Sequence, residues 1–365
     1  MKRKKLIPLP LLILIDVLAI ALCLNVYALF HHVLVGSLAA PSRSAAPSRT
    51  VSVIPTPSPK PAPTPAATPE PGAAEETPEP TEEPEPIDYG QFGEKFADLF
   101  AAEGEVIRTD TLYVSHDVRL ELTQDRQFNS DVHIIDVYVR NIENFRTTFA
   151  GGADVYDGQR ATVQDMAIRE NALAAINGDY CGFISGGEYV VLRNGVFFYS
   201  QPTRAVCVLY YDGTIRTFWK PFNQTSDDFD IDRAMEEGAW QIWSFGPALL
   251  DEEGHPNTLY FDAARPRTVL GYYEPGHYCF ITVDGRTEQN AGVTMDELAL
   301  LAESLGLTQA FNLDGGQSST MVFGAELVSI GSPYEGVREI SDMIYIVERD
   351  GSAPSFGETG KEAAP

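Results

Sequence analysis

Residues 311–323 read Phe-Asn-Leu-Asp-Gly-Gly-Gln-Ser-Ser-Thr-Met-Val-Phe, so an apolar approach ends in Asp314 and is followed by two glycines, three hydroxyl residues and a second apolar run. Glycine accepts positive φ and lets the backbone approach closely. Successive main-chain N–H groups in such a turn can bind an anion, and Asp314 would place a carboxylate beside them. An ordinary Asp-Gly turn between two strands is the alternative that this stretch leaves open.

Two helices are indicated near this motif and upstream of it. One is expected over residues 295–305, because Thr294 and Glu297 have the spacing of a capping box and Gly306 can end the helix. A second is expected over residues 163–170. Each helix leads into a short apolar strand that ends in a polar motif, which places both motifs where functional side chains often lie.

Strand patterns outnumber helical ones. Strands are predicted over residues 118–123, 132–140, 172–176, 278–283, 308–313 and 343–347, a hairpin over residues 205–217, and a short amphipathic helix over residues 92–100. We therefore expect an α+β fold class, with a single globular domain that contains a mixed β-sheet and flanking helices.

The first 86 residues have a different composition. Residues 1–35 contain four basic residues and then a long apolar run, which predicts a cytoplasmic start and a transmembrane signal anchor, with a cleaved signal peptide as the alternative. Residues 36–86 are rich in Pro, Thr and Glu and are expected to form a disordered stalk. The globular domain is expected over residues 87–348, and a disordered tail over residues 349–365.

The formal net charge is −26, which argues against a nucleic-acid partner because such a partner requires a basic face. It does not exclude a small anionic substrate, since a few arginines can reverse the field inside one cleft. Outside the apolar run the cysteines are Cys181, Cys207 and Cys279, with no CxxC spacing. We expect at most one disulfide and no zinc site.

Several standard motifs are absent, among them a P-loop, a GxSxG elbow, HExxH and GxGxxG. Short islands of Arg, Asp and Asn remain, such as Arg265-Pro266-Arg267-Thr268 and Asp284-Gly285-Arg286. Arginine suits a bidentate grip of phosphate. Each island alone is also compatible with a plain turn or a covered sheet edge.

Taken together and in this order, the islands resemble the phosphodiester glycosidase family. The resemblance spans roughly residues 106–347 and depends on the segments 176–180, 246–247, 265–268, 284–286, 298–306 and 312–321. One departure is Gln317, which stands where members of the family usually carry a third glycine. Its side chain puts the anion geometry of the turn in doubt.

The resemblance implies hydrolysis of a sugar-1-phosphodiester, as by an α-N-acetylglucosaminidase. The N-terminal anchor and stalk predict a membrane-anchored extracytoplasmic protein, for which an envelope polysaccharide or glycan is the expected substrate. Cleavage at the anomeric carbon needs a carboxylate near the developing cation and a cationic grip on phosphate. On this basis we predict Asp314 and Asp284 as catalytic residues, Arg267 and Arg286 as phosphate ligands, Gly315, Gly316 and Ser318 as donors to developing negative charge, and Asn177 and Asp179 as sugar ligands.

Other interpretations stay open at this point. Asp314 and Asp179 could instead bind a divalent cation, because hard cations prefer oxygen ligands. The protein could be a surface carbohydrate-binding module that uses Trp219, Trp240 or Trp243, although core packing is the commoner role of such residues. It could also be a transferase that modifies envelope polymers.

Overall fold

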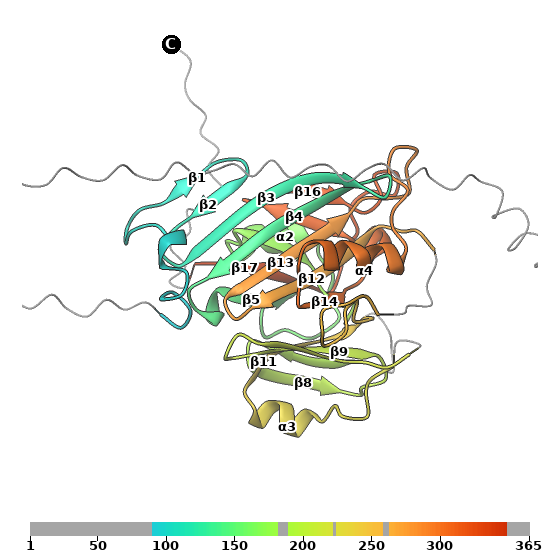
Figure 1. Ribbon diagram of the computed structural model, residues 1–365, viewed down its shortest axis with the longest axis horizontal. Helices are drawn as coiled ribbons and strands as arrows, with labels where there is room; N and C mark the ends of the chain where they lie inside the picture. The colour runs from blue at the N-terminus through green and yellow to red at the C-terminus, as the bar shows by residue number, and fades with distance from the viewer. Residues whose placement is uncertain (1–89, 182–188, 222–223, 258–262, 349–365) are drawn as a thin grey trace, which may run out of the picture. The chain divides into compact units, whose positions relative to one another are not determined.

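The long hairpin of β3 (Val118–Gln127) and β4 (Ser130–Val139) alternates buried and more exposed side chains along much of its length, as expected for strands with one face on the core. The computed structural model of the protein describes residues 90–181, 189–221, 224–257 and 263–348 (Figure 1). The hairpin belongs to a seven-stranded sheet. Its other strands are β1 (Ile107–Arg108), β2 (Leu112–Val114), β12 (Arg267–Glu274), β13 (His277–Val283) and β14 (Gln309–Asn312), in the order β1-β2-β3-β4-β13-β12-β14.

Two five-stranded sheets complete the domain. One has the order β16 (Glu326–Ile330), β15 (Thr320–Phe323), β6 (Ala174–Asn177), β17 (Asp342–Ile346), β5 (Phe145–Phe149). The other has the order β10 (Ile215–Phe218), β9 (Ala205–Tyr210), β11 (Ala239–Phe245), β7 (Val190–Arg193), β8 (Val196–Ser200).

The expected mixed sheet is wrong for the described strands, since each of their pairings is antiparallel. The reason is connectivity. Strands that follow one another often pair directly as hairpins, for example β12 with β13 and β15 with β16, and such tight connections reverse the chain. The single globular domain agrees with the sequence. The predicted α+β class holds only in part, because the described residues form mostly β-sheet with few and short helices.

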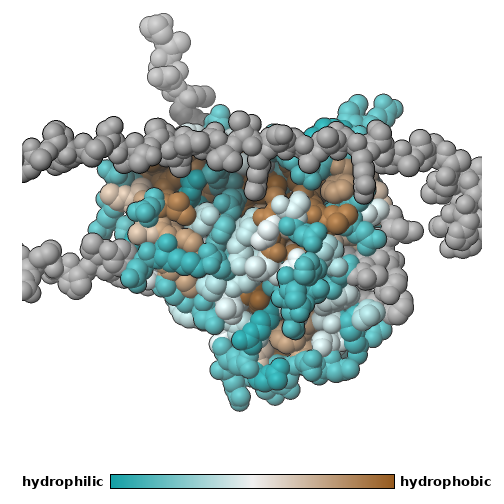
Figure 2. Space-filling view, viewed as in Figure 1, coloured by the Kyte–Doolittle hydropathy of each residue, from teal (hydrophilic) through white to brown (hydrophobic). Residues whose placement is uncertain are grey.

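Both capped helices are present. α2 (Val163–Arg169) is capped by the Thr162 side chain, and α4 (Met295–Ser304) has the complete capping box of Thr294 and Glu297. A further short helix, α3 (Ile231–Glu236), was not predicted. Figure 2 shows that hydrophilic residues predominate at the end of the molecule that carries α3.

The predicted helix over residues 92–100 is wrong. This segment forms turns and the 3-10 helix η2 (Ala97–Leu99), and Phe92 and Phe96 instead pack into the main core. The predicted anchor, stalk and tail lie outside the described residues. Within the described ranges, no helix is both long and apolar enough to span a membrane. Cys181, Cys207 and Cys279 are buried free thiols.

Phe145 joins the three sheets in the core. Its ring centroid lies 6.1 Å from that of Trp243 on β11, 5.2 Å from Tyr278 and 5.6 Å from Phe280 on β13. All four side chains are fully buried. The contacts therefore connect β5 to both other sheets through apolar burial, which is the main favourable term in folding.

The first prediction concerns this junction. Phe145→Ala should lower the free energy of unfolding by about 3–5 kcal/mol, because it removes a buried ring and leaves a cavity. Urea denaturation followed by circular dichroism measures the change. Phe197→Ala is the matched control, since Phe197 on β8 is 45% exposed. Equal effects of the two substitutions would contradict the central place of Phe145.

Candidate functional site

The loops that follow β6 and β14 lie side by side. The Asn177 side chain donates a hydrogen bond to the Asp314 carbonyl over 2.8 Å, and the Asp314 N–H donates to the Gly178 carbonyl over 3.3 Å. The two polar motifs singled out in the sequence, 137 residues apart, therefore meet at one end of the sheets. This convergence defines the candidate site.

Asn177 holds that convergence together. Its Oδ1 accepts from the Thr268 hydroxyl at 2.7 Å and from the Thr320 N–H at 3.1 Å, and its Nδ2 donates to the carbonyls of Gly178 and Asp314. A side-chain amide has two acceptor positions and two donors, so each is occupied within the protein. These contacts describe Asn177 as a buried positioning residue, and its role as a sugar ligand stays a prediction.

Asp314 has one carboxylate oxygen engaged and one without a partner. Its Oδ1 accepts from the Gly315 N–H at 2.9 Å, whereas Oδ2 is buried and makes no hydrogen bond to the described protein atoms. Burial raises the pKa of Asp314, while the Ser318 hydroxyl, the Gly315 N–H and the charge of Arg338 lower it. A buried unpaired carboxylate oxygen with a shifted pKa is typical of a catalytic or binding position.

The N–H groups of Gly315 and Gly316, predicted to bind an anion, have partners within the protein, so their anion-binding role stays a prediction. The Gly315 N–H donates to Asp314, and the Gly316 N–H donates to the Pro266 carbonyl at 2.9 Å. The absence of a side chain at Gly315 and Gly316 lets this loop pack closely against its neighbours. A Cβ on Gly315 would lie 3.0 Å from the Pro266 oxygen, and Gly316 has a φ of +66°. The loop is thus anchored to the start of β12.

Two arginines border this loop. Nη2 of Arg286 lies 3.0 Å from where a Cβ on Gly316 would stand, and its Nη1 donates to Glu335 at 2.6 Å. Arg338 donates to the buried Ser318 hydroxyl at 3.2 Å, and its guanidinium lies 5.6 Å from the ring centroid of Tyr180.

Arg286 and Ser318 therefore lie where the sequence places them, although their ligand roles stay predictions. Sequence reasoning missed Arg338, because that residue stands in a polar loop between β16 and β17 and belongs to none of the segments singled out.

Arg267 is buried at the start of β12 and has no carboxylate partner among the described residues. Its guanidinium donates to the carbonyls of Val293 and Ala263 at 3.2 and 2.9 Å. Burial, and then the charge of Arg265, lowers the pKa of Arg267 to about 10, so the group remains cationic at neutral pH. Its predicted phosphate-binding role is untested by these contacts.

Asp284 does not join Asp314 through any hydrogen bond in the described part of the chain. Its carboxylate instead contacts His133 Nε2 on β4 at 3.1 Å and accepts from the Ser329 hydroxyl on β16 at 2.5 Å. The joint catalytic role of Asp284 and Asp314 stays a prediction, since catalytic carboxyl pairs act without a hydrogen bond between them. His133 was missed because a lone histidine in a strand carries no motif signal.

Asp179 belongs to a buried ionic cluster rather than to an open surface. Its Oδ1 accepts from Arg193 at 2.9 Å and its Oδ2 accepts from the Ser244 N–H at 2.7 Å. Arg193 also donates to Asp342 Oδ2 at 3.1 Å, and the three charged side chains are almost wholly inaccessible. These contacts give Asp179 a structural role in the cluster, and its role as a sugar ligand stays a prediction.

Among the described residues, Asp314 and Asp179 do not belong together to any cluster of three or more metal-type ligands. The described cluster with metal-type ligand spacing is Asp179, Cys181 and Asp342, whose ligand atoms lie within 4.8 Å of one another. Arg193 donates to the carboxylates of Asp179 and Asp342, so its positive charge already compensates their negative charge. A metal ion there would meet strong repulsion from the guanidinium.

Comparison with known proteins shows which family and which solved structures the chain is similar to. Residues 170–347 match the sequence model of the phosphodiester glycosidase family. The SPbeta prophage-derived uncharacterized protein YomE of Bacillus subtilis is 30% identical over 210 residues, which cover 54% of this chain and 31% of that protein. Mouse N-acetylglucosamine-1-phosphodiester alpha-N-acetylglucosaminidase is 25% identical over 195 residues, which cover 48% of this chain and 36% of the mouse protein.

The chain thus spans only about a third of the length of these curated relatives. Among solved structures, the catalytic domain of zebrafish N-acetylglucosamine-1-phosphodiester alpha-N-acetylglucosaminidase, auto-inhibited by its pro-peptide, has a TM-score of 0.50 and 22% identity. The similarity covers 68% of this chain and 87% of the zebrafish chain. It shows that the two share a fold.

The second prediction tests the Asn177 network. Asn177→Ala should lower the free energy of unfolding by about 2–4 kcal/mol, because it leaves buried hydrogen-bonding groups of Thr320 and Asp314 without partners. Urea denaturation measures the loss. Gln159→Ala, at an exposed loop position, is the control and should change stability by less than about 0.5 kcal/mol. A change equally small for Asn177→Ala would contradict the network's role.

The third prediction concerns pH. Burial, and then the charge of Asp179, raises the pKa of Asp342 from 3.8 to about 7. The folded state then holds a proton that the unfolded state releases, so this group makes the free energy of unfolding fall as pH rises from about 4 to about 7. Denaturation at several pH values should give a shallower decline for Asp342→Asn. Identical slopes would refute the assignment.

Proposed function

We propose, from the membership of residues 170–347 in the phosphodiester glycosidase family, that this protein is a hydrolase that cleaves a sugar-1-phosphodiester into free sugar and a phosphomonoester. One observation carries the proposal. The unpaired Asp314 Oδ2 lies in the family motif, in a loop bordered by Arg286 and Arg338. A carboxylate beside two cations suits a substrate that joins a sugar to a phosphate.

The chemistry follows from charge placement. During cleavage the bond between the anomeric carbon and the phosphate oxygen breaks, and its electron pair stays on phosphate. Arg286 and Arg338 would stabilise that growing negative charge, and Asp314 would stabilise or attack the oxocarbenium-like carbon. Water then adds to the carbon and, where Asp314 has attacked, breaks the bond between the carbon and the Asp314 oxygen, whose electron pair returns to the carboxylate. The proton of the water passes to the freed Asp314 carboxylate or to solvent. Phosphate leaves readily, so little general-acid assistance is needed.

The remaining residues act by position. Asn177 fixes the Asp314 carbonyl, and Ser318 lies between the Asp314 carboxyl and Arg338. Hydrogen bonds of this kind hold a reacting group in its productive geometry. Arg267 adds a buried positive charge next to the loop, since its Cδ lies 3.9 Å from where a Cβ on Gly315 would stand.

The location and the natural substrate are part of the proposal. Residues 1–35 have the composition of a signal anchor, and residues 36–86 that of an extended stalk. This organisation favours a membrane-anchored enzyme whose domain faces the cell envelope, with an envelope polysaccharide or glycan as substrate. A transferase that uses the same linkage is the second candidate, because attack by a sugar hydroxyl in place of water needs the same charges.

The fourth prediction tests the catalytic role. Asp314→Asn should lower kcat on an activated sugar-1-phosphodiester by about 10²–10⁴-fold, because it removes the ionisable group at the reacting carbon. Arg338→Ala should also weaken activity, through lost phosphate stabilisation. The full chain in detergent is assayed on a panel of sugar-1-phosphodiesters, with and without chelator.

Glu326→Gln, at an exposed position on β16, is the control and should keep full activity. A wild-type protein that is inert on the whole panel would refute the hydrolase proposal, as would an Asp314→Asn variant of undiminished rate. An added sugar acceptor distinguishes hydrolysis from transfer, since only a transferase forms a new glycoside.

A further inference from the structure

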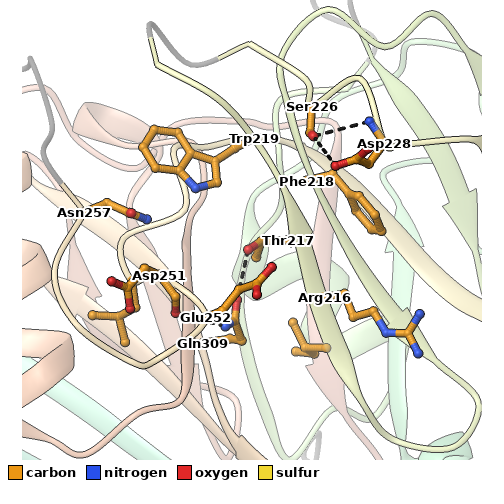
Figure 3. A pocket seen from close by; sticks show the side chains of 12 residues that line it. Arg216, Thr217, Phe218, Trp219, Ser226, Asp228, Asp251, Glu252, Asn257 and Gln309 are labelled. Carbon is orange, nitrogen blue, oxygen red and sulfur yellow. Dashed lines mark hydrogen bonds between the residues drawn. The ribbon is translucent and has the colours of Figure 1, made fainter.

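A second polar hollow lies apart from the Asp314 loop. It has a volume of about 640 Å³. It is lined by residues 215–219, at the end of β10 and just after it, and by residues 250–252 and Asn257. In Figure 3, Trp219 and Asn257 lie on one side, Arg216 and Asp228 lie on the other, and Thr217 and Gln309 lie between them. Nothing in the proposed reaction uses these residues.

Trp219 differs from the other two tryptophans. Trp243 is fully buried in the core, and the Trp240 indole N–H donates to the Phe145 carbonyl at 2.9 Å. Trp219 is half-buried at the wall of the hollow, and its indole N–H has no hydrogen-bond partner within the described segments. An aromatic ring with a polar edge at a solvent-facing hollow is suited to binding a ligand that has both apolar and hydroxyl surfaces.

Hydrogen bonds within the protein hold the side chains of Thr217, Gln309 and Asn257, which line the hollow with Trp219. The Thr217 hydroxyl donates to Gln309 Oε1 at 2.9 Å, and Gln309 Nε2 donates to the Asp251 carbonyl at 3.3 Å. Asn257 donates through Nδ2 to the Ala248 carbonyl at 3.1 Å, which leaves its Oδ1 as an acceptor. The exposed Glu252 carboxylate makes no hydrogen bond with any described residue. The Asn257 Oδ1, held in place by its amide, and the unpaired Glu252 carboxylate are therefore available as acceptors near the ring.

The charged side chains that line the hollow disfavour binding of a phosphate group. Its lining carries Asp228, Asp251 and Glu252 against the single cation Arg216. This balance repels anions and favours hydroxyl donors, whereas the Asp314 loop is bordered by arginines. A few polar groups around an aromatic wall are the usual composition of a small-ligand site.

We infer that the hollow at Trp219 is a glycan-binding subsite that holds uncharged sugar units. The inference rests on the proposed function for the idea that the substrate is a glycan. Gln309 begins β14 and Asp314 follows its end, five residues later, which is about 16 Å of extended chain. An extended substrate would place its phosphate linkage at the cationic loop and its uncharged units at the acidic hollow.

Calorimetric titration tests the subsite without reference to catalysis. The full chain is titrated with neutral oligosaccharides of glucose and of N-acetylglucosamine. Trp219→Ala should weaken binding by about tenfold, through loss of the aromatic platform. Phe197→Ala is the matched control, because it removes an exposed aromatic ring from β8, at the opposite edge of the same sheet, and should leave binding unchanged.

Glu252→Gln is a second variant, at an exposed position where misfolding is not expected, and it should also weaken binding because it removes a carboxylate from the lining. Absence of binding by the wild-type protein, or unchanged affinity in folded Trp219→Ala and Glu252→Gln variants, overturns the subsite. Asp314→Asn should retain oligosaccharide binding. A wild-type protein that hydrolyses nothing on the panel but shows Trp219-dependent binding would therefore refute the enzyme and leave the subsite standing.

Discussion

The Asn177 amide holds the candidate site to the fold. Its bonds reach Thr268 on β12, Thr320 on β15 and the carbonyl of Asp314, so one side chain ties two sheets to the loop that carries the unpaired carboxylate. The adjoining contacts have the same character. Thr282 of β13 approaches Met321 of β15, and Asp284 links His133 of β4 to Ser329 of β16. A polar layer thus joins the sheets at the end where the site lies.

The two residues that follow Asn177 both pack against the buried Asp342 carboxylate or share its arginine partner. Gly178 leaves room for Asp342, since a Cβ there would lie 2.3 Å from the Asp342 Oδ2. Asp179 then shares Arg193 with that carboxylate. Buried ion pairs add little net stability but can fix one arrangement of a core. We therefore interpret this cluster as the support that orients the β6 loop beneath Asp314.

Local features of the chain were predictable because they depend on neighbours in sequence. Thr294 and Glu297 specify the start of α4, and the apolar runs specify most of the strands. The motif around Asp314 also indicated the family, which the family match confirms. Partners distant in sequence were not predictable. Arg338 reaches Ser318 from another loop, and the Gly316 N–H bonds the Pro266 carbonyl, a main-chain acceptor without any sequence signature.

β17 lies between β6 and β5 although it is the last strand of the domain. β5 has β17 as its sole neighbour in that sheet, so the sheet cannot close until residue 346 is available. A nascent chain that lacks this strand exposes the unpaired edges of β5 and β6, which are sites for wrong pairing. The domain must therefore assemble after nearly all of its sequence has been made, from contacts of long sequence separation that slow folding.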